Sequence, residues 1–133
     1  MSTPGLPFIT MVPQRYKTDC GVATLAMLCG VTYERAMLAI SETTVMTSGV
    51  QLRKVRDAAR RLGKQLTLRR KIDLDNDTGI LSVTAPGWDF EHLVILHEGV
   101  IIDAQDQTVW DYETYLTAHE ARVVSLLALR EDK

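Results

Sequence analysis

The chain has 133 residues, of which 46% are hydrophobic and 24% are charged, and its formal net charge is −2. This balance is typical of one globular domain that buries a core without disulfides or metals, and we expect a single domain over 1–133. The slight negative charge provides no global field that favours nucleic acid. No apolar run reaches the roughly 20 residues of a membrane-spanning helix, and no secretion signal opens the sequence, so the expected location is cytoplasmic.

Helical spacing of apolar residues dominates the first half of the chain. Residues 1–13 hold three of the four prolines and predict an extended N-terminal arm. The expected helices are 20–29, 33–40 and 50–62. Their expected boundary residues are Thr18 or Asp19 and Gly30 for the first, Thr32 for the second and Gly63 for the third. A polar, threonine-rich loop is expected at 41–49.

The second half of the chain changes to a period of two, which is typical of strands. Strands are expected at 65–69, 79–83, 92–96, 100–103 and 121–129, with a short helix at 112–119 that Asp111 caps. The strands 92–96 and 100–103 predict a hairpin. Helices first and strands second indicate an α+β domain, in which an N-terminal helical half packs against a C-terminal antiparallel β-sheet.

One cysteine, Cys20, lies where a polar loop gives way to an apolar helix. A thiol at a helix start is close to unpaired backbone N–H groups and to the positive end of the helix dipole. Both favour the thiolate, which is the nucleophilic form. Cys29 lies in the apolar part of the same helix, roughly 13 Å along the axis, and is expected to be a core residue. That separation is too large for a disulfide.

Two cysteines and three scattered histidines give no spacing typical of a zinc site. We therefore expect no metal and no cofactor. His92 is the candidate base, because it opens an apolar strand at the end of a polar loop. His97 falls in the predicted turn and His119 near the end of a helix, and both are expected to face solvent.

The predicted hairpin places His92 and Asp103 on consecutive strands. If Leu96 pairs with Gly99, the two lie directly opposite each other, with Cβ atoms about 4.5–5.5 Å apart. A slip of two residues keeps them on one face as diagonal neighbours, whereas a slip of one separates them. A carboxylate beside an imidazole fixes its tautomer and stabilises imidazolium. A surface aspartate at a strand end is the other interpretation, and the alternative carboxylates are Asp89, Glu91 and Asp106.

The offset of Gln14 from the cysteine, six residues, gives this glutamine a possible role. Hydrolysis of an amide develops negative charge on the former carbonyl oxygen, and donors aimed at that oxygen are worth about 2.7–4 kcal/mol each. The backbone N–H of Cys20 and the side-chain amide of Gln14 form a candidate pair of donors. No GxSxG, P-loop or GxGxxG motif offers a competing site.

These residues together resemble the papain-like cysteine peptidases, and most closely the bacteriocin-processing (double-glycine leader) peptidase family and its stand-alone relatives. That family has a glutamine and, six residues later, the cysteine of an Asp-Cys-Gly sequence. An Ala-x-Leu-x-Met helix follows. Next come a helix that ends in Leu-Gly, a His-x-Val-x-Leu strand and a strand that ends in an aspartate. The matching residues here are Gln14, Asp19-Cys20-Gly21, Ala23, Leu25, Met27, Leu62-Gly63, His92, Val94, Leu96 and Asp103.

The resemblance implies a papain-like fold with the site in the cleft between helices and sheet. It implies that Cys20 is the nucleophile, His92 the general base and then acid, Asp103 the orienter and Gln14 the oxyanion donor. Ala104 stands where the family usually has proline. The parent family is normally the front end of a membrane transporter, and no transporter is expected in this chain, so the resemblance does not supply the substrate.

The leading hypothesis is a cysteine peptidase that cuts a peptide or isopeptide bond in a peptide or protein substrate. A thiol-dependent acyltransferase or deamidase uses the same thioester intermediate and stays open as an alternative. A catalytically silent peptide-binding module is the alternative from another class. Nucleic-acid binding through the basic residues of 53–71 is disfavoured, because the net charge is negative and that stretch has no aromatic residues.

Overall fold

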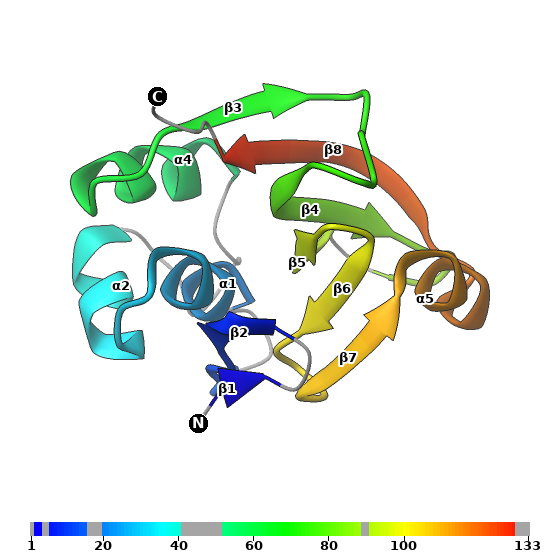
Figure 1. Ribbon diagram of the computed structural model, residues 1–133, viewed down its shortest axis with the longest axis horizontal. Helices are drawn as coiled ribbons and strands as arrows, with labels where there is room; N and C mark the ends of the chain where they lie inside the picture. The colour runs from blue at the N-terminus through cyan, green and yellow to red at the C-terminus, as the bar shows by residue number, and fades with distance from the viewer. Residues whose placement is uncertain (1, 4–5, 16–19, 41–51, 89–90, 130–133) are drawn as a thin grey trace.

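A computed structural model describes residues 2–3, 6–15, 20–40, 52–88 and 91–129. Its helices are α1 (Cys20–Cys29), α2 (Tyr33–Ile40), α4 (Leu52–Arg61) and α5 (Tyr112–His119). Its strands are β1 (Ser2–Thr3), β2 (Leu6–Thr10), β3 (Leu66–Arg69), β4 (Thr78–Thr84), β5 (His92–His97), β6 (Val100–Asp103), β7 (Thr108–Asp111) and β8 (Arg122–Leu129). Helices α1, α2 and α4 gather beside the sheet, and α5 lies at its far end (Figure 1). The predicted α+β fold is confirmed.

The helix boundaries follow the capping residues. The Thr32 hydroxyl accepts a hydrogen bond from the backbone N–H of Arg35 at 3.1 Å, as an N-cap does. Gly30 has a φ of +69°, and the next N–H, of Val31, donates to the Ala26 carbonyl at 3.0 Å. This is the hydrogen bond of a Schellman motif, and it explains why α1 stops where the glycine predicts. The predicted caps Thr18 and Asp19 and the loop 41–49 lie outside the described residues.

Helix α1 is the central element of the core. Every side chain from Cys20 to Leu28 is buried. The helix packs against β4 and β5 on one side and against α2 and α4 on the other. A helix that is apolar on all sides is stable only when it is surrounded in this way. The cysteine at its first position is therefore fixed by the packing of the whole helical half.

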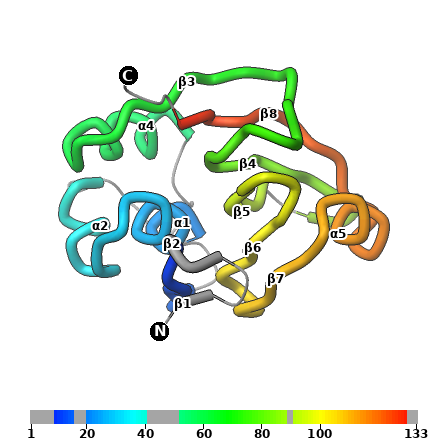
Figure 2. The backbone as a smooth tube through the Cα atoms, in the orientation of Figure 1, coloured from blue at the N-terminus to red at the C-terminus, as the bar shows by residue number. Residues whose placement is uncertain are grey.

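The main sheet has six strands in the order β3-β8-β4-β5-β6-β7, all antiparallel to their neighbours. Its two faces are both covered, as the alternation along β5 shows. Leu93 and Ile95 pack with the helical half, whereas Val94 and Leu96 pack in a second cluster that includes Tyr115 of α5. The tube in Figure 2 shows that β7 leads directly into α5. The side chains on both faces of β5 are therefore held in place by packing.

The β5–β6 hairpin turns through Glu98 and Gly99. Their φ angles are +46° and +85°, as a two-residue type I′ turn requires. His97 consequently pairs with Val100, and Ile95 pairs with Ile102. The predicted turn included His97 and paired the residue before it with Gly99.

This register decides how the histidine and the aspartate meet. Continued by one more residue on β6, it sets Asp103 opposite Val94 and not opposite His92. The prediction of direct opposition is therefore wrong by two residues. Since side chains alternate with a period of two, the shift leaves His92 and Asp103 on the same face as diagonal neighbours.

Three of the described strands, β1, β2 and β7, were not predicted. β7 adds an edge to the sheet by pairing with β6, where Asp103 lies opposite Thr108. In the N-terminal arm, β1 and β2 pair with each other in a separate two-stranded sheet. Each of these strands has at most five residues, which is too short for a period of two to stand out in the sequence. Among the described helices, none alone has the length and composition to cross a membrane; α1 and α2 pass that test only together and are bent by 112°.

Replacement of Gly79 by alanine tests the close approach of β4 to β8. A Cβ built on Gly79 would overlap the backbone carbonyl oxygen of Leu127, which cannot move without breaking the ladder. We expect Gly79→Ala to lower the free energy of unfolding by about 2 kcal/mol or more, measured by urea denaturation. Gly63→Ala is the matched control, because Gly63 has open space but a φ of +87°, and it should cost about 1 kcal/mol. Equal losses in the two variants would contradict this account.

Candidate active site

The centre of the site is an imidazole paired with a carboxylate. His92 is the first residue of β5 and Asp103 is the last of β6, so the antiparallel pairing brings them to the same end of the sheet. His92 Nε2 lies 3.0 Å from Asp103 Oδ1. The side chains are only 12% and 4% exposed, respectively. The structure thus brings together the histidine and the aspartate that the sequence selected.

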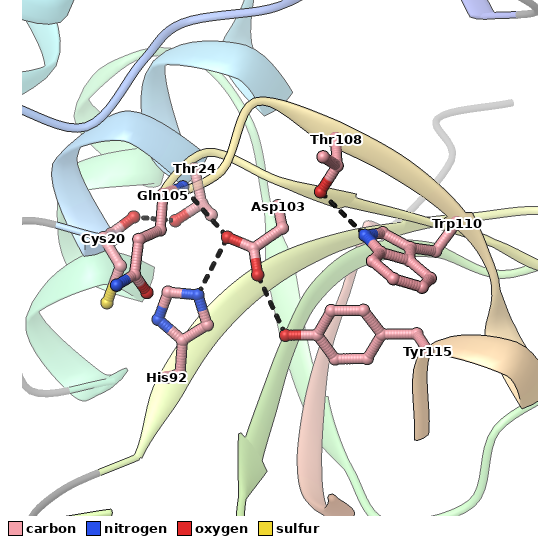
Figure 3. Close-up of polar contacts among 8 residues, drawn as sticks. All are labelled: Cys20, Thr24, His92, Asp103, Gln105, Thr108, Trp110 and Tyr115. Carbon is pink, nitrogen blue, oxygen red and sulfur yellow. Dashed lines mark hydrogen bonds and ion pairs between the residues drawn. The ribbon is translucent and has the colours of Figure 1, made fainter. Parts of the chain in front are cut away.

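Cys20 lies on the other side of the imidazole. In Figure 3 the other ring nitrogen of His92, Nδ1, faces the Cys20 sulfur. Burial alone would lower the pKa of His92, but hydrogen bonds to Asp103 and Cys20 and the charges of both outweigh burial and raise this pKa from 6.5 to about 10. The raised pKa therefore favours a protonated imidazole at neutral pH.

The Asp103 carboxylate has three hydrogen-bond donors. Oδ1 also accepts from the backbone N–H of Gln105 at 2.9 Å, and Oδ2 accepts from the hydroxyl of Tyr115 at 3.0 Å. Burial would raise the pKa of Asp103, but the hydrogen bond and charge of His92, followed by the bonds from Gln105 and Tyr115, hold it below its usual value. Asp103 is therefore a carboxylate, and it can only accept.

Gln14 lies next to this carboxylate through its backbone. Its N–H donates to the carbonyl of Ala104, the residue after Asp103, at 3.3 Å. The following residue, Arg15, holds the same segment to α2: its guanidinium lies 2.7 Å from Glu34 and 4.0 Å from the ring centre of Tyr33. These contacts tie the segment of Gln14 to both halves of the fold. The role of its side chain as an oxyanion donor stays a prediction.

Sequence reasoning missed two aromatic side chains at the site. Trp88 lies edge-on to the His92 ring, with ring centres 6.0 Å apart and an interplanar angle of 87°. Tyr115 is fully buried and bonds to Asp103. Trp88 stood in the loop before His92 and could have been found by its position. Tyr115 could not, because it reaches the site only when α5 docks on the sheet.

Of the other candidate carboxylates, the two that the structure describes are not partners of His92. Glu91 accepts a hydrogen bond from the hydroxyl of Ser82 on β4. Asp106 is exposed, and Asp89 lies outside the described residues. Among the three carboxylates that the structure describes here, only Asp103 bonds to the imidazole.

The predictions that His97 and His119 face solvent are wrong. His97 Nδ1 is 2.7 Å from the Thr78 hydroxyl, and its side chain is only 20% exposed. His119 stacks on the Tyr115 ring with centres 4.2 Å apart. In both cases a neighbouring strand or helix covers a ring that local sequence placed at a turn or a helix end.

Within the described residues, neither Cys29 nor a group of metal-binding side chains forms a second candidate site. Cys29 is free and half-buried, and burial raises its pKa to about 11 against the opposing charge of Lys64. Within the described segments, no three His, Cys, Asp or Glu side chains are grouped so that they could hold a metal ion.

Comparisons with known proteins identify the fold. No protein-family model and no curated protein matches the sequence. Among solved structures, a double glycine motif protease from an AMS/PCAT transporter, crystallised in complex with the leader peptide, matches with a TM-score of 0.64. The match covers 92% of this chain and 92% of that chain at 19% sequence identity. The resemblance is thus confirmed at the level of the fold: the chain has the papain-like fold of a double glycine motif protease.

The environment of Cys20 predicts selective alkylation. At pH 7 we expect iodoacetamide to modify Cys20 faster than free cysteine, because the positive charge of the His92 imidazole beside the sulfur promotes its attack. Cys29 should stay unmodified over the same time, since its raised pKa keeps it a thiol. Peptide mapping by mass spectrometry measures both cysteines in one sample. His92→Ala should lose the selectivity, and labelling of Cys20 no faster than free cysteine would refute the prediction.

The raised pKa of His92 also predicts how stability depends on pH. The folded protein holds the imidazole proton up to about pH 10, whereas the unfolded chain releases it near pH 6.5. The stabilisation is complete below the unfolded value and is lost as pH rises toward 10. We therefore expect the free energy of unfolding to fall between about pH 7 and 10, measured by urea denaturation. His92→Gln should flatten this slope, and His97→Gln, at the other end of β5, should keep it; equal slopes in wild type and His92→Gln would contradict the assignment.

Proposed function

We propose that the chain is a cysteine peptidase that hydrolyses a peptide bond through Cys20, His92 and Asp103. The observation that carries this proposal is the position of His92, bonded to a buried carboxylate on one side and paired with a cysteine at a helix start on the other. A nucleophile, a base and an orienter in that order are the requirements of covalent acyl chemistry.

The reaction begins with attack of the Cys20 thiolate on the carbonyl carbon of the scissile bond. The imidazolium of His92 gives its proton to the leaving nitrogen, the C–N bond breaks, and a thioester remains on Cys20. Water then attacks the thioester while His92 accepts one of its protons. The acid product leaves and the thiolate–imidazolium pair is restored. Asp103 stays ionised throughout and holds the imidazole in one orientation.

The negative oxygen of the tetrahedral intermediate needs donors close to Cys20. The backbone N–H of Cys20 is one, because the first N–H groups of a helix have no partner within the helix. The amide of Gln14 is the second in our proposal. Its support is the tether from Gln14 to Ala104, which brings this segment to the end of β6 where Asp103 lies.

A peptide is the proposed substrate. The protease with the same fold was crystallised with the leader peptide bound, and acyl chemistry by a thiolate suits amide bonds in an extended chain. A peptide that ends its recognition segment in two glycines is the first sequence to test, with alanine replacing both glycines in a matched peptide.

Cleavage of a peptide library tests the function. We expect the wild-type protein to cut a subset of peptides, with one atom of heavy oxygen from labelled water entering the new carboxylate, both read by mass spectrometry. Cys20→Ala and His92→Ala should abolish cleavage, and Gln14→Ala should lower kcat about 100-fold. Acyl transfer to an added amine without label from water would instead indicate an acyltransferase.

Two control variants separate chemistry from folding. Cys29→Ala removes the other thiol and should cleave like wild type. Gln65→Ala removes an exposed amide beside β3 and should also leave kcat unchanged. Cleavage that survives in Cys20→Ala, or no cleavage of any peptide by a wild-type protein that is folded, would overturn the proposed function.

A further inference from the structure

We propose that Tyr115 of α5 is a positioning residue, which holds the Asp103 carboxylate in place behind His92. The inference rests on the proposed function, because it assigns Tyr115 a role in that same site. Its starting point is the division of the carboxylate between its donors. Oδ1 takes the bonds from His92 and Gln105, whereas Oδ2 takes the bond from Tyr115 (Figure 3).

Both partners of the Oδ2 bond are buried. Tyr115 is 0% exposed and Asp103 is 3% exposed. A buried carboxylate oxygen without a donor is costly, so the hydroxyl satisfies a requirement that solvent cannot meet. Burial and the charge of Asp103 raise the pKa of Tyr115 well above its usual value. The hydroxyl therefore keeps its proton at neutral pH and donates to Asp103.

The ring that carries this hydroxyl is itself held on both sides. Trp110 lies edge-on to it with ring centres 5.8 Å apart, and His119 stacks on it at 4.2 Å. Trp110 is anchored by its Nε1–H, which lies 2.7 Å from the Thr108 hydroxyl. His119 Nδ1 is 2.9 Å from the Tyr115 carbonyl. Trp110 and His119 thus pack against the Tyr115 ring and leave its hydroxyl little freedom to move. We call these two rings the bracket of Tyr115.

The bracket joins the last helix and the edge strand to the site. Trp110 lies on β7, which pairs with β6, the strand of Asp103. Tyr115 and His119 lie one turn apart on α5. A catalytic group is effective only when its own supports are rigid to within about 0.5 Å. The role of the bracket is thus to fix the direction in which Asp103 presents Oδ1 to His92.

The Tyr115→Phe variant removes the hydroxyl and keeps the ring and its bracket. Freed at Oδ2, the carboxylate can rotate about its Cβ–Cγ bond, which weakens its bond to His92. We expect kcat for peptide cleavage to fall about tenfold to a hundredfold with KM unchanged. Tyr112→Phe is the matched control: it makes the same change on the same helix, and none of the three hydrogen bonds to Asp103 comes from Tyr112. It should cleave like wild type.

A pH profile separates positioning from general stability. The titratable groups that act on His92 are Asp103 and Cys20, and Asp106 acts with them on Tyr115. The alkaline transition in the rate of Cys20 alkylation by iodoacetamide reports the loss of the His92 proton. In Tyr115→Phe this transition should move to lower pH, because a loosened Asp103 holds that proton less well. A transition that stays in place or moves to higher pH overturns the proposal.

A double-mutant cycle completes the test. If Tyr115 acts through Asp103, Tyr115→Phe should have no further effect on alkylation rate in an Asp103→Asn background. Additive losses would mean that Tyr115 acts elsewhere, and would overturn the inference. Because alkylation needs no peptide, it also separates the two proposals. If Cys20→Ala loses cleavage but Tyr115→Phe and Tyr112→Phe cleave at equal rates, this inference fails and the proposed function stands. A shifted alkylation profile in a protein that cleaves no peptide defeats the proposed function alone.

Discussion

The buried carboxylate of Asp103 sets the condition on which the rest of the site depends. Removing such a charge from water costs several kcal/mol unless donors surround it. Its donors come from three separate places: the start of β5, the turn after β6 and the middle of α5. The carboxylate is satisfied only when the hairpin has its register, the turn has closed and the last helix has docked. The site therefore forms only when these parts of the fold have assembled.

The same condition explains why the sheet is buried on both faces. One face packs against α1 and delivers Cys20, while the other packs against α5 and delivers Tyr115. The imidazole stands at the end of β5, where both layers reach it. Because interiors are close-packed, neither Cys20 nor Tyr115 can move without displacing the helix that carries it. The raised pKa of His92 follows from its hydrogen bonds to Asp103 and Cys20, which outweigh its burial.

The features that could be predicted from the sequence depend on local backbone chemistry or on the alternation of side chains along a strand. Gly30 and Thr32 marked helix ends because backbone caps are local. The shared face of His92 and Asp103 survived an error of two residues in the register, because strand side chains alternate strictly. Tyr115 and the stacked His119 were not predictable, since α5 meets the sheet only through packing of distant segments. The edge strand β7 was missed because a four-residue strand of mixed polarity has no distinctive period.

The alanine at position 104 shows how a local departure from a family pattern can be structurally neutral. Proline after the aspartate would restrict the turn through its ring. In this chain two hydrogen bonds hold the turn: the Gln105 N–H donates to Asp103 Oδ1, and the Ala104 carbonyl accepts from the Gln14 N–H. Neither bond uses the side chain or the N–H of residue 104, so both are compatible with alanine and with proline at this position. The bond from Gln14 to Ala104 couples the segment before Cys20 to the strand of Asp103, so that the position of Gln14 and the position of Asp103 depend on one turn.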